Sequence, residues 1–348
     1  MLACMRLTRG ASLALASAAL FGASTPFAKA LVGAVGPWLM AGLLYLGSGL
    51  GLFALSFALR GREAPLRRAD LPWLAAVVLA GGVAGPVLLM FGLKATPASS
   101  ASLLLNLEGV LTLAIAWLVF RENVDLRIGA GAAAILLGAG LLSWNGAAGT
   151  FGWGALAIAA ACLSWAIDNN LTRKLSGADP LQVAMVKGLA AGGVNVALAF
   201  ALGASWPGTG AAAAAGTIGF LGYGVSLVLF VLALRHLGAA RTAAYFSLAP
   251  FVGAALAIAL FGEPMTPVFI AAAGLIAIGL YLHLAERHEH EHAHDALQHE
   301  HRHVHDPHHR HTHAAGDPPG EPHSHVHAHG RLVHSHPHFP DIHHRHSH

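Results

Sequence analysis

Four ionisable side chains lie inside long apolar stretches of this 348-residue chain. A charged group inside a bilayer is costly, so each of these residues is a functional candidate by default. The four are Glu108, Asp168, Lys187 and Lys29, and the amides Asn106, Asn169, Asn170 and Asn195 lie at similar depths. We expect the substrate or proton path to include Glu108, Asn106, Asp168, Asn169, Asn170 and Lys187.

Glu108 stands near the middle of its apolar stretch, residues 98–120. A carboxyl group in a cavity of low dielectric constant can bind a proton and exchange it for a cation, which is the minimal chemistry of proton-coupled antiport. The alternative is a buried carboxyl group satisfied by a neighbouring helix. We favour the first interpretation for Glu108.

Asp168 and Lys187 have two interpretations between which the sequence does not choose. They either belong to the path or form a structural ion pair between adjacent helices. For Lys29, near the end of its stretch, we favour a side chain that extends to the membrane interface.

The last 64 residues contain 23 of the 25 histidines. Most recur at every second position, and residues i and i+2 of an extended chain project to the same side, so adjacent imidazoles can share one ion. Neutral imidazole suits Zn, Ni, Co and Cu, and no cofactor is otherwise required. The candidate ligands are His288, His290, His292, His294, His299, His301, His303, His305, His323, His325, His327, His329, His334, His336 and His338.

Two other interpretations of this tail stay open. It is either a solvated segment without a ligand, or a segment that becomes cationic in mild acid and binds anionic lipid. Because it has almost no large apolar side chains, we expect it to be disordered when no ligand is bound. A purification tag is disfavoured, since no run exceeds two consecutive histidines.

Composition places the rest of the chain among all-α integral membrane proteins: 55% of its residues are hydrophobic and 11% are charged. Ten apolar stretches approach the roughly 20 residues that cross a bilayer as a helix. They are residues 11–32, 38–59, 71–93, 98–120, 126–142, 153–171, 181–202, 211–234, 242–261 and 268–284.

The ten stretches consist of a five-stretch unit that occurs twice. A shift of 141 positions pairs Leu107 with Leu248, Phe120 with Phe261, Glu122 with Glu263 and Gly138 with Gly279 without a gap. We therefore divide the chain into a first repeat (1–146), a second repeat (147–284) and the tail (285–348). Each repeat has five spans, an odd number, so the second must be inverted relative to the first.

Orientation follows from the basic residues. Twelve Lys and Arg residues lie at one set of alternating span ends and only Lys29 and Lys94 at the other, which places both termini in the cytoplasm and the protein in the inner membrane. The first span also resembles a signal peptide. We reject that interpretation because Phe21 and Lys29 align with Trp165 and Arg173 at the start of the second repeat.

Two five-helix halves, each with an apolar span that ends in Phe-x-Glu, resemble the EamA type of the drug/metabolite transporter superfamily over about residues 10–284. The second half has the family's Leu-x-Pro-x pattern as Leu248 to Phe251, whereas the first half has Glu108 and Gly109 at this place. The resemblance implies transport, mostly export, of small molecules.

Two classes of function remain. In the first, the chain is a secondary active transporter, a proton-coupled exporter of a small molecule or divalent metal ion, and the tail binds metal in the cytosol. In the second, the tail is a metal sensor or store and the bundle is its membrane anchor. Intramembrane carboxylates favour the first class, because an anchor needs none.

An enzyme is not expected, since no nucleophile motif, phosphate loop or Cys-rich zinc site occurs in the sequence. The expected partners are the substrate, membrane lipid and, as an open alternative, a second copy of the chain. Nucleic acid is not expected because the tail has more acidic residues than arginines.

The charge asymmetry predicts topology. In cells that carry single cysteine variants, Gly149→Cys should react with an impermeant thiol reagent, because the loop between the repeats lies outside. Ser347→Cys should be protected until the membrane is opened. The reverse pattern would show that the orientation is wrong.

Overall fold

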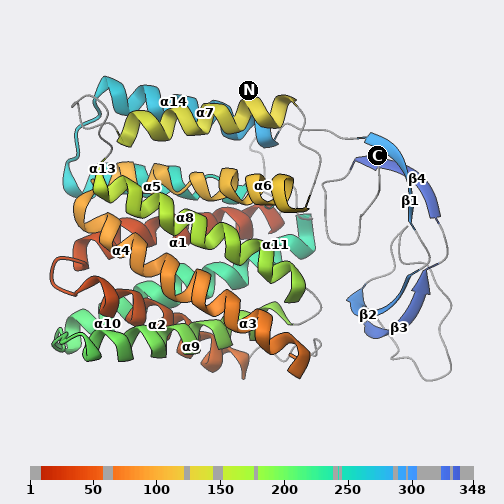
Figure 1. Cartoon of the computed structure of the whole chain (residues 1–348), viewed down its shortest axis with the longest axis horizontal. Helices are drawn as coiled ribbons and strands as arrows, with labels where there is room; N and C mark the ends of the chain where they lie inside the picture. The colour runs from red at the N-terminus through yellow and green to blue at the C-terminus, as the bar shows by residue number, and fades with distance from the viewer. Residues whose placement is uncertain are drawn as a thin grey trace.

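The computed structural model describes residues 9–57, 66–120, 126–143, 152–175, 179–237, 242 and 245–284, together with four strands of the tail, residues 289–294, 297–303, 323–329 and 332–337. Glu122, Gly149 and Ser347 lie outside these ranges. The described residues between Arg9 and Leu284 form a bundle of roughly antiparallel helices (Figure 1).

The first half begins with α1 (Arg9–Leu31) and α2 (Pro37–Ser56). A short 3-10 turn (Arg68–Asp70) leads into α3 (Leu71–Val77), η2 (Val78–Ala84) and α4 (Gly85–Ala95), which form one continuous span. The half ends with α5 (Ala98–Leu104), α6 (Leu107–Phe120) and α7 (Leu126–Ser143).

The second half follows the same order. It contains α8 (Trp153–Thr172), a 3-10 turn (Arg173–Leu175), α9 (Pro180–Ala201), the continuous span α10 (Thr209–Gly219), η4 (Phe220–Val225) and α11 (Ser226–Leu237), then α13 (Ala249–Phe261) and α14 (Pro267–Leu284).

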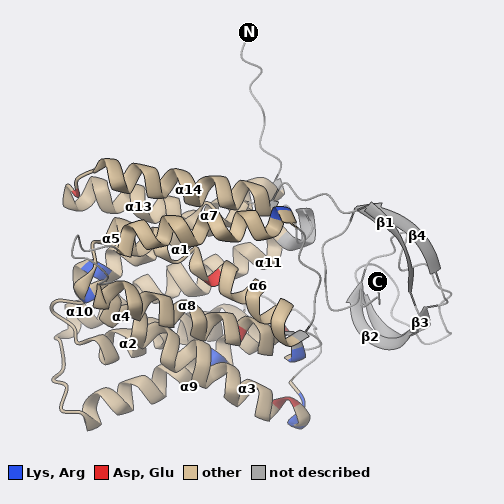
Figure 2. Cartoon of the chain, turned by 45° about the horizontal axis from the view of Figure 1, so that its top comes forward, with Lys and Arg blue, Asp and Glu red and all other residues tan. Residues whose placement is uncertain are grey.

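Seven of these helical segments are long and apolar enough to cross a membrane, so the chain is a multi-pass membrane protein. Helices α8, α13 and α14 occupy the other three predicted ranges without meeting that measure, so the count of ten spans is not confirmed. Large apolar side chains such as Leu118, Leu79 and Trp117 are exposed on the bundle, as lipid contact requires. The few charged residues lie mostly near its ends (Figure 2).

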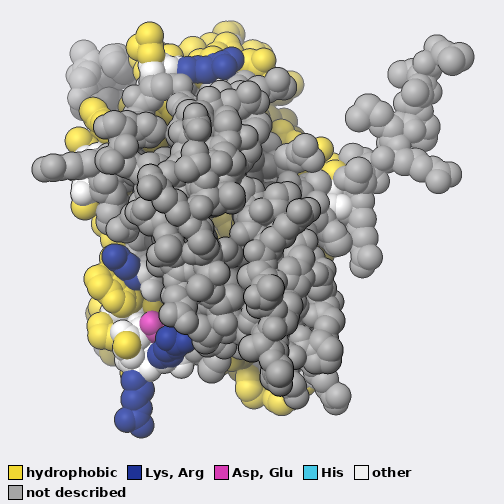
Figure 3. All heavy atoms as spheres, turned by 90° about the vertical axis from the view of Figure 1, so that its right-hand side faces the viewer, with side chains coloured by type: hydrophobic (Ala, Val, Ile, Leu, Met, Phe, Trp, Pro, Cys, Tyr) yellow, Lys and Arg dark blue, Asp and Glu magenta, His cyan; other side chains and the backbone are white. Residues whose placement is uncertain are grey.

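One end of the bundle is seen in Figure 3, where the visible charged side chains among the described residues are mainly Lys and Arg. This distribution agrees with the asymmetry in the sequence. The side of the membrane on which this end lies stays a prediction.

The two halves meet where α2 crosses α9. A Cβ atom on Gly49 would overlap the backbone of Leu189, and one on Gly192 would overlap the backbone of Leu46. Glycine therefore lets the two helix backbones touch, as small residues do in membrane helix pairs. The two contacts are reciprocal, because each helix supplies one glycine to the backbone of the other.

Two spans contain a π-helical segment, in which the backbone N–H bonds to the carbonyl five residues earlier. The segments are η2 and η4, and the 141-residue shift of the sequence repeat moves η2 onto residues 219–225, almost onto η4. The third span of each half thus departs from regular α-helix at the same place. Such segments frequently mark functional sites.

The tail departs from the expectation of disorder in the four segments that the structure describes. Strand β1 (Glu289–His294) pairs with β4 (Leu332–Pro337), and β2 (Leu297–His303) pairs with β3 (His323–His329), both antiparallel. His288, His305 and His338 lie outside the described residues.

Candidate functional site

The fourth span is interrupted in its middle, between α5 and α6 at Leu105 and Asn106. The Asn106 amide Nδ2 donates to the Leu103 carbonyl at 2.9 Å, and the Cys162 thiol faces the carbonyls of Leu104 and Leu105 at 3.7 and 3.9 Å. The backbone N–H groups of Leu105, Asn106 and Glu108 bond to the carbonyls three residues earlier, so the interruption is a 3-10-type turn to which these side chains add donors. Discontinuous helices of this kind build the substrate sites of many transporters.

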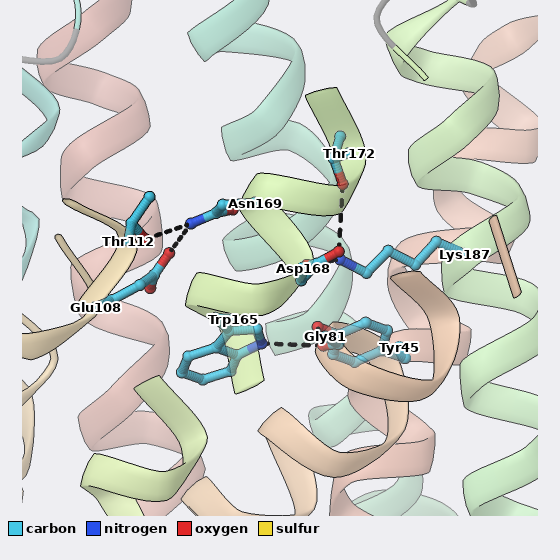
Figure 4. Close-up of polar contacts among 9 residues, drawn as sticks. All are labelled: Tyr45, Gly81, Glu108, Thr112, Trp165, Asp168, Asn169, Thr172 and Lys187. Atoms are coloured by element: carbon cyan, nitrogen blue, oxygen red, sulfur yellow. Dashed lines mark hydrogen bonds and ion pairs between the residues drawn. The ribbon is translucent and has the colours of Figure 1, made fainter. Parts of the chain in front are cut away.

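Glu108 lies in the first turn of α6, directly after this interruption. A helix N-terminus carries partial positive charge, so it favours a carboxylate. The Asn169 amide Nδ2, on α8, lies 2.8 Å from Glu108 Oε1 and 3.4 Å from the hydroxyl of Thr112 (Figure 4). Glu108 is half-buried and Asn169 is exposed, so this pair is not sealed in the core.

Asp168, the residue before Asn169, has a different partner. Its carboxylate forms an ion pair with Lys187 on α9 and accepts a hydrogen bond from the Thr172 hydroxyl at 3.3 Å (Figure 4). The side chains of Lys187 and Asp168 are 18% and 6% exposed. Two consecutive residues of α8 therefore hold a buried ion pair on one side and a more accessible carboxylate on the other.

The side-chain amides of Asn170 and Asn195 are buried, and only one of the two polar atoms of each has a hydrogen-bond partner in the described part of the chain. Asn170 Nδ2 donates to the carbonyls of Ala166 and Thr112 at 2.8 and 3.3 Å, and Asn195 Nδ2 donates to the Gly82 carbonyl at 3.0 Å. Neither Oδ1 atom has a protein partner among the described residues. Asn169 and Asn170 thus both reach Thr112 on α6, whereas Asn106 bonds within its own span and Asn195 contacts the third span.

Lys29 is not part of this cluster. Its ammonium group donates to the carbonyls of Leu93 and Thr96, where α4 ends. Cations stabilise the C-terminal end of a helix, so this contact is structural in kind.

Three residues of the site were missed at the sequence level. The Tyr45 hydroxyl and the Trp165 indole Nε1 both donate to the Gly81 carbonyl, at 2.8 and 2.9 Å. Glu263, noted only as part of the repeat, accepts from the backbone N–H groups of Ala98 and Ser99 at 2.8 and 2.9 Å and so caps α5. Pro86, which follows Gly81 and Gly82 inside an apolar stretch, was the available signal that carbonyls here need other donors.

No group of three or more His, Cys, Asp or Glu residues could hold a metal ion among the described residues. The metal ligands proposed from the sequence all belong to the tail. Binding of Zn, Ni, Co or Cu there stays a prediction.

The Asp168–Lys187 pair predicts a compensating pair of substitutions. Asp168→Asn or Lys187→Met alone should lower stability by about 3–5 kcal/mol, because either leaves an uncompensated buried charge. The double variant should recover most of that loss. Thermal unfolding in detergent measures the stability of all three variants, and equal losses in the single and double variants would contradict a direct pair.

Flux through the same variants separates the two interpretations of the pair. If it is only structural, the double variant should transport like the unmodified protein. If it belongs to the path, the double variant should be stable and inactive.

Comparison with known proteins agrees with this architecture. Residues 8–144 and 152–285 each match the family described as the EamA-like transporter family. An uncharacterized transporter of Methanothermobacter thermautotrophicus is 28% identical over 266 residues, which cover 71% of this chain and 77% of that protein. A solved crystal structure shares the fold with a TM-score of 0.58 and 21% identity, over 78% of this chain and 95% of that one. With both halves matched, the chain belongs to the EamA-like transporter family.

Proposed function

We propose that this protein is a proton-coupled secondary transporter that exports a small molecule or a divalent metal ion across the cell membrane. The observation that carries the proposal is the position of Glu108, half-buried in the first turn of a helix that begins inside the bundle. Carboxyl groups at such places mark proton and substrate paths.

The partners of Glu108 suit reversible protonation. Its carboxylate accepts a hydrogen bond from a neutral amide, Asn169, at 2.8 Å, and no ion pair with Glu108 occurs among the described residues. A proton on the carboxylate can therefore be exchanged for a cation, and no fixed ion pair has to separate. Asn169 can follow the change, because its amide also reaches the Thr112 hydroxyl.

The direction of transport is proposed from the predicted topology. With both termini in the cytoplasm, the basic ends of the helices and the histidine tail face the compartment from which an exporter takes its substrate. The inward proton gradient then drives export by exchange at Glu108.

The second candidate is a metal sensor or store held at the membrane. The fifteen alternating histidines of the tail favour it. Against it stands the bundle, in which an interrupted helix, an accessible carboxylate and a buried ion pair meet at one place. A membrane anchor needs none of these features.

Glu108→Gln should abolish flux driven by a pH gradient while folding stays close to normal, because glutamine keeps the shape and the contact with Asn169 but does not ionise. Proteoliposome flux with a panel of metals and amino acids, with and without a pH gradient, measures the effect. Glu108→Asp is the matched control, since it retains a carboxyl group and should retain pH-dependent flux. Unchanged pH dependence in Glu108→Gln would reduce Glu108 to a structural residue.

Truncation after Arg287 distinguishes the two candidates. If the tail serves the transporter, flux should survive at saturating substrate and weaken at low metal concentration, where a tethered ligand raises the local concentration. If the tail is the functional unit, truncation should remove every metal-dependent effect at all concentrations. Full transport of an organic substrate without the tail would exclude metal as the transported species.

A further inference from the structure

The backbone of the third span leaves two carbonyl groups without main-chain donors. At the end of η2 the Gly85 N–H bonds to the Ala80 carbonyl, five residues earlier. The chain returns to α-helix at Gly85, and the change from i−5 to i−4 bonding passes over one carbonyl. The next residue, Pro86, has no N–H and removes one further donor, so the two carbonyls affected are those of Gly81 and Gly82. In hydrocarbon an unsatisfied carbonyl costs several kcal/mol, so these two groups need donors from elsewhere.

Three buried side chains from three other helices supply those donors. The Tyr45 hydroxyl of α2 and the Trp165 indole of α8 bind the Gly81 carbonyl, and the Asn195 amide of α9 binds the Gly82 carbonyl at 3.0 Å. Tyr45 and Trp165 are each 8% exposed and Asn195 is 0% exposed. Side chains of other helices therefore stabilise the π-helical backbone; Figure 4 shows the contact of Trp165 with Gly81.

The same segment fixes the ion pair. A Cβ atom on Gly81 would collide with the Asp168 carboxylate, and one on Gly82 would contact the Lys187 stem at 3.6 Å. The η2 backbone thus forms one wall of the Asp168–Lys187 site. Bending of η2 would therefore change the packing around both partners.

Helix α8 connects this wall to Glu108. Trp165 and Asn169 are four residues apart and so lie one turn apart on the same face of α8. Asn169 binds Glu108 while Trp165 binds Gly81. A shift of α8 that follows the charge of Glu108 is thereby carried to the η2 carbonyl.

The second half has an equivalent helix crossing at η4 but lacks the proline next to it. A Cβ atom on Gly222 of η4 would collide with Ser24 of α1. The shift of 141 residues relates Gly81 to Gly222, and the shift of 144 that aligns Phe21 with Trp165 relates Ser24 to Asp168. Each π-helical segment therefore crosses the first span of the opposite half, but in the second half Leu227 stands at the position of Pro86 and provides the N–H group that proline lacks.

We propose that Tyr45, Trp165 and Asn195 are positioning residues that latch η2 as a hinge, and that the latch responds to the state of Glu108 through α8. The first half bends at η2 when the latch opens, which moves the Asp168–Lys187 pair relative to Glu108. The link to Glu108 rests on the proposed function, whereas the latch itself does not.

The latch is tested by hydrogen exchange of residues 78–86 in the full chain in lipid nanodiscs, which needs no substrate. Tyr45→Phe or Trp165→Phe leaves the Gly81 carbonyl one donor, so each should raise exchange little. The double variant leaves none and should raise exchange about tenfold, more than the two single effects multiplied together. Trp206→Phe and Tyr281→Phe, at exposed positions, are the matched controls.

Adding Pro86→Ala to the double variant should reverse the effect, because alanine in place of Pro86 supplies the missing N–H and η2 can relax to α-helix. If the double variant does not fold, Pro86→Ala alone should slow the exchange of residues 78–86. Multiplicative single effects, or no rescue by Pro86→Ala, would overturn the latch.

The link to Glu108 is tested in the same measurement. The protection factor of residues 78–86, which corrects the exchange rate for the intrinsic pH dependence of amide exchange, should change with pH in the unmodified protein and lose that change in both Glu108→Gln and Trp165→Phe. A pH response that survives in Trp165→Phe but not in Glu108→Gln would overturn transmission through α8. If flux shows no proton coupling while the latch variants behave as expected, the proposed function fails and the latch stands.

Discussion

The structure depends on one constraint: a backbone that crosses hydrocarbon must satisfy every N–H and carbonyl group within the protein. Regular helices do this alone, but this chain breaks its fourth span at Asn106 and changes its third span to π-helix before Pro86. At the first irregularity, backbone N–H groups bond to carbonyls three residues earlier, and the Asn106 and Cys162 side chains add donors. At the second, Tyr45, Trp165 and Asn195 donate to the Gly81 and Gly82 carbonyls. Several of the buried polar side chains therefore serve the backbone itself.

The irregular segments occur at equivalent places in the two halves, but the side chains around them differ. The crossing of η2 with α8 and the crossing of η4 with α1 occupy equivalent positions in the two halves. At the first crossing the neighbour is Asp168, paired with Lys187, and at the second it is Ser24, whose hydroxyl bonds to the Phe21 carbonyl. One crossing has a small neutral contact and the other has a charged one. The site is therefore asymmetric although the scaffold is duplicated.

The sequence could predict those parts of the fold and site that depend on composition. Apolar stretches located the helices, and charge inside them identified Glu108, Asp168 and Lys187. It could not show that consecutive residues of α8 have different partners, because that depends on which helices pack beside it. Trp165 was noted only for its alignment with Phe21 and not as a site residue, since an aromatic residue in an apolar stretch resembles lipid-facing or core sequence. Its role appears only once the carbonyl of Gly81 is seen to lack a backbone donor.

The two carboxylates of the site differ in what a change of charge would cost. Protonation of Asp168 would leave the Lys187 ammonium without its partner in a buried position, and an uncompensated buried charge is strongly destabilising. Protonation of Glu108 leaves only a neutral amide, Asn169, which retains the Thr112 hydroxyl as an alternative partner. Loss of the charge on Glu108 would therefore disturb fewer contacts than loss of the charge on Asp168. The adjacent α8 residues Asp168 and Asn169 thus place an ion pair with α9 beside a neutral contact with α6.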